Sequence, residues 1–344
     1  MTIRTRNFML GSAAILVTGL CTGLVAYYGG IPGTFARSSG PDELAYMPAN
    51  AIAVAYANVG DVMKSDLREH LRAVMPEEDK EKGREEFKQV TGIDIERDID
   101  SVVVAIAPDG EGRAPVVAIR GRFDEGKIEA LAREHGGTVD TSNGKRVIMM
   151  PRGDRHRGEE GQAQETEQPR RHDFQPALAF VEPGLALFGN AELVKAGLNR
   201  KAGQNLTANG EMMARIEKLD RDANAWAVGR IDALTGQGRL PEHVASQLPS
   251  LTWVEASGHL NGGIRGTLRA ETRDEQAAKN LRDMINGLMA LGRMQAQSKP
   301  EVQSLMQAIT LGGSGTTVEM SFTIPAELID AMTPKAKVKT VAFK

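Results

Sequence analysis

ANAIAV at residues 49–54 recurs as ANAWAV at residues 223–228, with five of six positions identical, and each copy opens a strand-like apolar run. The segments after the two copies match in kind, and each includes a helix that begins with an acidic pair, Asp124-Glu125 or Asp274-Glu275. The order strand, helix, strand, strand, helix, strand is the split βαβ plan. We therefore predict an α+β fold of two ferredoxin-like (βαββαβ) units that arose by duplication, each an antiparallel sheet with helices on one face.

Local signals place the elements of these units. Asp124 is a plausible N-cap for a helix over residues 125–135, and Gly136 is its expected C-terminal stop. Asn143-Gly144 predicts a tight turn between strands. Further strands are expected at residues 51–57, 101–107, 115–123, 145–150, 177–181, 185–188, 252–260, 264–271 and 317–324.

The N-terminal region contains an uncharged apolar stretch, Phe8–Tyr28, directly after Arg4 and Arg6. A helix of this length spans the hydrocarbon core of a bilayer, which is about 30 Å thick. The two arginines keep the N-terminus in the cytoplasm by the positive-inside rule. We expect a single-pass membrane protein whose soluble part is exported.

An alternative is a cleaved signal peptide, since Thr34-Phe35-Ala36 is an acceptable small-x-small cleavage site. The length of the apolar stretch and the two tyrosines at its end favour a retained anchor. Cys21 is the only cysteine, and because Leu20 precedes it, a lipoprotein acceptor is disfavoured. The exported part therefore holds no internal disulfide.

These signals divide the chain into segments. The prediction is a cytoplasmic N-terminus (1–7), a transmembrane helix or signal anchor (8–28), a linker (29–48), a first α+β unit (49–220), a second unit (221–332) and a basic tail (333–344). Residues 151–173, within the first unit, have almost no apolar side chain and are expected to form a disordered loop.

Composition excludes some function classes. The formal net charge is −3 and there is no block of basic residues, so a nucleic-acid partner is not expected. Only 4% of the residues are aromatic, and Trp226 and Trp253 both lie in strand-like runs where a core position is the default.

A search for catalytic, cofactor-binding and metal-binding residues finds none that the sequence supports. No two histidines stand three or four apart, although His156 and His172 share the 151–173 loop with several carboxylates and could hold a metal weakly. Gly312-Gly313-Ser314-Gly315 lacks the second glycine of a serine elbow and is interpreted as the stop of a helix over residues 300–309. The acidic run Asp94, Glu96, Asp98 and Asp100 lacks the spacing of a calcium loop and is expected on a solvated turn.

Methionine is the unusual residue type. Met284, Met289, Met294 and Met306 fall on the last two expected helices, and Met212, Met213 and Met320 occur elsewhere. Thioether side chains either fill a core against a sheet or line a surface for apolar partners. The lysines of the tail are either part of a frayed terminus or a contact for anionic headgroups.

Two stretches resemble a family. Residues 91–100 (TGIDIERDID), which run into a valine-rich strand, and residues 189–194 (GNAELV), which follow a strand, are similar to segments of exported, membrane-anchored bacterial proteins of unknown function with repeated α+β units. The resemblance implies a location in the bacterial envelope, with the anchor in the inner membrane and the soluble part in the periplasm or outside the cell. It supplies no catalytic residue.

The leading hypothesis is a membrane-tethered, non-enzymatic envelope protein that acts as an interaction or scaffold module, with the bilayer contacted through residues 8–28 and an envelope protein as partner. The second is a module that binds a lipid or another apolar ligand at the membrane surface. An envelope hydrolase is the third and least favoured. A homodimer formed by edge-to-edge pairing of sheets is possible.

Overall fold

The computed structural model describes residues 41–63, 88–109, 112–151, 174–199, 203–231, 251–260, 263–295, 303–304 and 307–326. The predicted membrane segment (8–28), the linker up to residue 40, nearly all of the predicted loop (152–173) and the basic tail lie outside these residues. Among the described helices, none combines the length and apolarity needed to cross a membrane.

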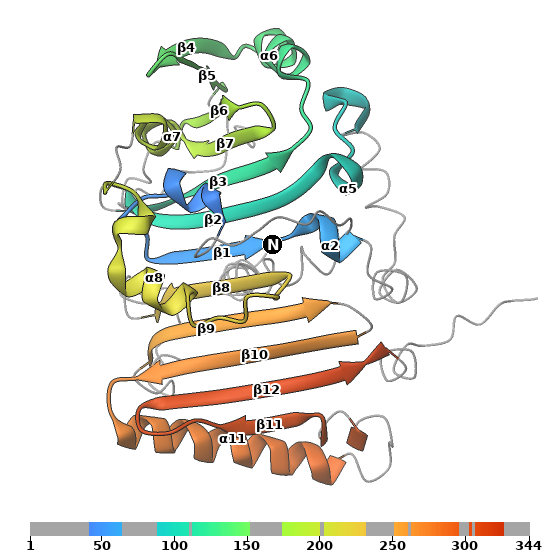
Figure 1. The fold of residues 1–344 in the computed structure, drawn as a ribbon, viewed down its shortest axis with the longest axis vertical. Helices are drawn as coiled ribbons and strands as arrows, with labels where there is room; N and C mark the ends of the chain where they lie inside the picture. Colours follow the sequence, from blue (N-terminus) through green and yellow to red (C-terminus); the bar gives the residue numbers. More distant parts are fainter. Residues whose placement is uncertain are drawn as a thin grey trace, which may run out of the picture.

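The described residues form one sheet of twelve strands, which lie side by side in Figure 1 from β4 at one end to β11 at the other. The strands are β1 (Ala53–Ala57), β2 (Ile99–Asp109), β3 (Gly112–Gly121), β4 (Thr138–Ser142), β5 (Lys145–Met149), β6 (Pro176–Glu182), β7 (Leu185–Asn190), β8 (Ala225–Arg230), β9 (Leu251–Leu260), β10 (Gly263–Thr272), β11 (Ile309–Gly312) and β12 (Thr317–Pro325). Their order in the sheet is β11-β12-β10-β9-β8-β1-β2-β3-β7-β6-β5-β4.

The described helices are short, with one exception. They are the 3₁₀ helices η1 (Asp42–Tyr46) and η2 (Leu206–Ala208) and the α-helices α2 (Val59–Met63), α5 (Ile95–Asp98), α6 (Glu125–Glu134), α7 (Ala191–Asn199), α8 (Gly210–Ile216) and α11 (Glu275–Gln295). The exception is α11, with 21 residues. It lies at the β11 end of the sheet (Figure 1).

The prediction of two ferredoxin-like units is wrong. In a split βαβ unit, another strand lies between the two strands that a helix connects, so these two strands do not pair with each other. Here the twelve strands form one continuous antiparallel sheet, in which strands that the prediction separated are direct neighbours. In particular, β1 pairs directly with β2, the next strand along the chain. The expected order of elements was compatible with either topology, because periodicity identifies the type of an element and not the strand that it pairs with.

The two matching hexapeptides meet at the centre of the sheet. Strands β1 and β8 pair antiparallel with Val54 opposite Val228 and Tyr56 opposite Trp226. The rings of Tyr56 and Trp226 stack with centroids 5.7 Å apart. The β1–β2–β3 meander continues on one side of this pair and the β8–β9–β10 meander on the other. The two halves of the chain are therefore joined in one continuous sheet.

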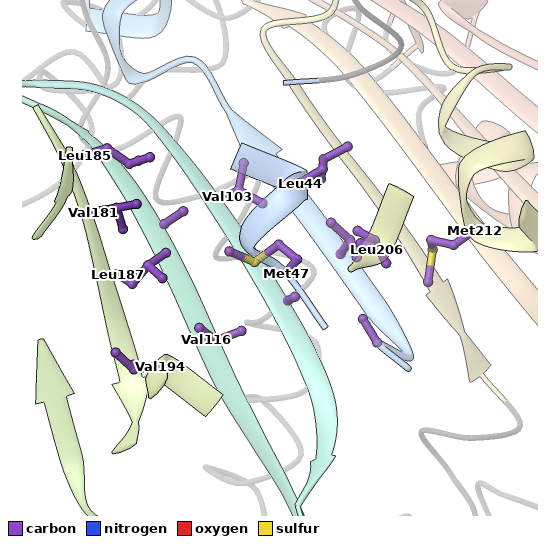
Figure 2. Packing of buried hydrophobic residues seen from close by; sticks show 14 of the residues in the cluster. Leu44, Met47, Val103, Val116, Val181, Leu185, Leu187, Val194, Leu206 and Met212 are labelled. Atoms are coloured by element: carbon purple, nitrogen blue, oxygen red, sulfur yellow. The ribbon is translucent and has the colours of Figure 1, made fainter. Parts of the chain in front are cut away.

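The largest core cluster lies on one face of the sheet. Figure 2 shows Leu44, Met47, Leu206 and Met212, from η1, η2 and α8 and the turns beside them, packed against strand residues such as Val103. Leu44, Met47, Leu206 and Met212 are each at most 1% exposed. Alternation along the strands presents small and β-branched residues to these helices, which gives a closely packed layer.

The opposite face carries three smaller clusters, as the alternation of side chains requires. Ala57, Val62 and Leu260 form the first, around α2. Ile148, Phe180 and Ala186 form the second, where α6 supplies Ile128 and Ala132. The third joins Ala278 and Leu281 of α11 to Val318 of β12. Thus α11 covers only the outer part of this face.

Several local predictions are confirmed. The Asp124 carboxylate accepts a hydrogen bond from the Lys127 amide at 2.9 Å, which makes it the N-cap of α6. Asn143 and Gly144 both have positive φ, as a tight hairpin turn between β4 and β5 requires. One local prediction is wrong: residues 309–312 form strand β11, paired with β12, and do not end a helix. The short apolar run of β11 suits a strand at the edge of the sheet.

Candidate interaction surface

Helix α11 is fixed to the sheet by its first half. The Asp274 carboxylate accepts a hydrogen bond from the Ala277 amide at 2.8 Å, and Glu275 in the first turn favours the positive end of the helix dipole. Ala278 is fully buried and Leu281 is 8% exposed. The Arg282 guanidinium donates to the carbonyl oxygens of Gly315 and Thr317, at 2.9 and 3.1 Å. These contacts hold the helix against the β12 end of the sheet.

The second half of α11 exposes a row of large apolar side chains. Met284 is 42% exposed, Leu288 62%, Leu291 57% and Met294 68%. Their spacing of four, three and three residues places them along one side of the helix. We call these four residues the α11 surface. A helix that is apolar outside its packed side is normally covered, so this surface is a candidate for contact with another molecule.

Exposed apolar side chains concentrate at this end of the protein. Among the described residues, the large hydrophobic side chains that are exposed are the four of the α11 surface together with Val90, Phe174 and Leu268. Leu268 lies on β10, opposite Met320, two pairs along the strand from Ala270 and Val318 beneath α11. Single exposed hydrophobic residues are ordinary, whereas a cluster indicates an interaction site.

Two polar residues of this part of α11, Asn286 and Arg293, lie on the other side of the helix. Arg293 is the only charged residue between positions 284 and 295, and it is exposed. Asn286 and Arg293 each stand two residues away from a member of the apolar row, so they point away from it. The helix is therefore divided into an apolar side, a polar side and the narrow side that packs on the sheet.

The methionines include both buried core residues and exposed surface residues, which are the two alternatives that the sequence allowed. Met212 is fully buried and Met213 is 9% exposed, so these two fill the core beneath α8. Met289 and Met320 are half-buried. Met284 and Met294 belong to the α11 surface, and Met306 lies outside the described residues. The sequence placed Met284, Met289 and Met294 on an expected helix, but it did not show which side of that helix the sheet would cover.

The histidines do not gather in the described part of the chain. No group of three or more potential metal ligands is found there. His135 ends α6, while His156 and His172 lie outside the described residues. His259 Nε2 lies 2.7 Å from the Asp220 carboxylate, and this hydrogen bond holds the pKa of Asp220 below its ordinary value. The contact ties β9 to the turn before β8.

The acidic residues over positions 94–100 form hydrogen bonds and ion pairs within the chain. Asp94 caps α5 by accepting from the Glu96 amide at 3.1 Å, and it pairs with Lys88 at 2.9 Å. Burial opposes ionisation of Asp94 most strongly, but its hydrogen bonds and its cationic neighbours together hold the pKa below the usual range. Asp98 accepts from the Asp94 amide at 2.8 Å. These bonds agree with the interpretation of a turn leading into β2.

An ion-pair network missed by the sequence analysis connects α8 to the sheet. Arg215 contacts Glu255 at 2.9 Å and Glu271 at 2.6 Å, and its guanidinium lies 4.2 Å from the centroid of the Trp253 ring. Arg269 bridges Glu255 and Glu319 at 3.4 and 2.7 Å. Glu255 is only 3% exposed. A glutamate inside the strand TWVEASGHL was the available signal. We assign the network a structural role, because it satisfies a buried carboxylate.

Comparisons with known proteins identify no family. No family model matches the chain, and no curated protein matches it. Among solved structures, crystal form IV of TP0453 matches with a TM-score of 0.43 and 9% identity, covering 86% of this chain and 98% of that one. Crystal form I of TP0453 matches with a TM-score of 0.43 and 10% identity, covering 85% and 96%. Similarity at this level assigns no function.

Proposed function

We propose that the chain is a non-enzymatic binding module held at the bacterial inner membrane by residues 8–28, with its folded part exported, and that it contacts its partner through the α11 surface. The observation that carries the proposal is the row Met284, Leu288, Leu291 and Met294, with exposed fractions from 42 to 68%. Leaving such side chains in water forgoes about 1 kcal/mol or more each, so their exposure favours a partner.

The arrangement of charge supports binding over catalysis. The most buried carboxylates, Glu43 and Glu255, are each paired with arginine: Glu43 with Arg120 and Glu255 with Arg215 and Arg269. These ion pairs connect η1 and α8 to strands of the sheet. The α11 surface, by contrast, makes no such internal contact and faces outward.

Site-specific photo-crosslinking in the bacterial host tests this proposal. A photoreactive amino acid is placed at Leu291 in the full chain, and a matched control carries it at Asn286, which is exposed on the polar side of the same helix. We expect a crosslinked product from position 291 that is absent or much weaker from position 286. Equal yields from the two positions would remove the support for the α11 surface as a binding site.

A further inference from the structure

We propose that the α11 surface contacts the interfacial region of a lipid bilayer, with the helix lying in the plane of the membrane. This inference rests on the proposed function, because it names the partner of the same surface.

The shape of the row disfavours a small apolar ligand. Small-molecule sites are concave and bury most of the ligand between several walls. Leu288, Leu291 and Met294 are each more than half exposed and follow one another along a single helix. Such a row forms a ridge and not a pocket. A ridge can be inserted into a soft, apolar medium without a matching cavity.

The chemistry of the row disfavours a protein partner. Protein interfaces of standard size carry about ten hydrogen bonds and a polar rim. The four residues of the α11 surface have no hydrogen-bonding side chain apart from weak thioether acceptors, and Asn286 lies on the other side of the helix. Acyl chains require no hydrogen bonds from the surface that they cover.

The charges of α11 match an interfacial helix. After Glu275, the charged residues of α11 are Lys279, Arg282, Asp283 and Arg293. Arg282 is bound to the carbonyl oxygens of Gly315 and Thr317, which leaves Lys279 and Arg293 as the basic residues of the polar side. Helices that lie in the membrane interface combine an apolar side with a polar side rich in lysine and arginine. The predicted anchor would keep α11 close to the bilayer, so that weak insertion becomes effectively intramolecular.

Fluorescence in nanodiscs made of phosphatidylcholine and phosphatidylglycerol tests the contact. The full chain with Cys21→Ser receives a single cysteine at Leu288, Leu291 or Asn286, labelled with an environment-sensitive dye. Because the labelled positions are exposed, the core of the sheet is left intact. We expect lipid-borne quenchers to reduce emission severalfold more at positions 288 and 291 than at 286, and aqueous iodide to show the reverse order.

The outcomes separate this inference from the proposed function. Equal quenching by lipid at the three positions overturns the bilayer contact. If position 291 also crosslinks to a protein in the host, the proposed function stands with a protein partner or a second copy of the chain. If the chain does not remain with the nanodiscs at all, both the tether and the bilayer contact are contradicted.

Discussion

Val54 and Val228, the last residues of the two matching hexapeptides, lie directly opposite each other in the antiparallel pair β1–β8. They are 2% and 1% exposed and belong to the same core cluster. Equivalent positions of the two copies thus face each other at the centre of the sheet. The pair joins what the sequence suggested were two separate sheets, while the duplication itself stays a prediction.

This pairing makes the stability contributions of the two valines interdependent. We expect Val54→Ala and Val228→Ala each to lower the free energy of unfolding by about 2 kcal/mol through lost burial and an incompletely filled cavity. The double variant should deviate from additivity by about 0.5 kcal/mol or more, because the residues are in contact. Chemical denaturation measures all three values. As a control, Val54→Ala combined with Val147→Ala, in the distant strand β5, should be additive.

Tyr56 should make the protein sensitive to alkaline pH. Burial raises its pKa from 10.0 to about 12, and the carboxylates of Glu43 and Asp61 add to the effect. The neutral phenol is therefore favoured in the folded state, and its contribution is fully present below pH 10. It is lost as the pH rises from 10 to about 12, by up to about 3 kcal/mol.

The measurement for Tyr56 is the difference in unfolding free energy between the natural chain and Tyr56→Phe as a function of pH. The difference should be constant below pH 10 and should shift against the natural chain above it. A difference that stays constant up to pH 12 would show that Tyr56 ionises equally in the folded and unfolded states.

The network around Glu255 gives a third prediction. Arg215→Met removes one of the two cations that neutralise this buried carboxylate, and we expect a loss of about 3 kcal/mol or more in unfolding free energy. Arg122→Met is the matched control, since Arg122 is 62% exposed in its pair with Asp98. Its effect should stay below about 1 kcal/mol. Similar losses in both variants would contradict the structural role assigned to the network.

Gly287, which precedes Leu288 in α11, is a position where a substitution should stabilise the protein. A Cβ atom at this position would meet nothing within 4 Å, so packing does not require the glycine. We expect Gly287→Ala to raise the free energy of unfolding by about 0.5–1 kcal/mol, because alanine restricts the unfolded chain and favours a helix. Thermal unfolding followed by circular dichroism measures it. A lower melting temperature would indicate that α11 is strained or otherwise packed here.

The sequence predicted local structure better than topology. The cap at Asp124 and the turn at Asn143-Gly144 depend on neighbouring residues, and both are confirmed. The pairing of β1 with β8 joins residues more than 160 positions apart, and no local pattern specifies it. Likewise, the sequence predicted a helix that begins at Asp274-Glu275, but not that Met284 and Leu288 would lie on a side of it that the sheet does not cover.

The most direct test of the central claim, that the α11 surface is covered by a partner, is cysteine accessibility in the host cell. Leu291→Cys and Asn286→Cys are made in the full chain with Cys21→Ser and treated with a membrane-impermeant maleimide, in cells and after purification. We predict that position 291 reacts slowly in cells and rapidly when purified, while position 286 reacts rapidly in both. Equally rapid reaction of position 291 in cells and in the purified protein would contradict the account.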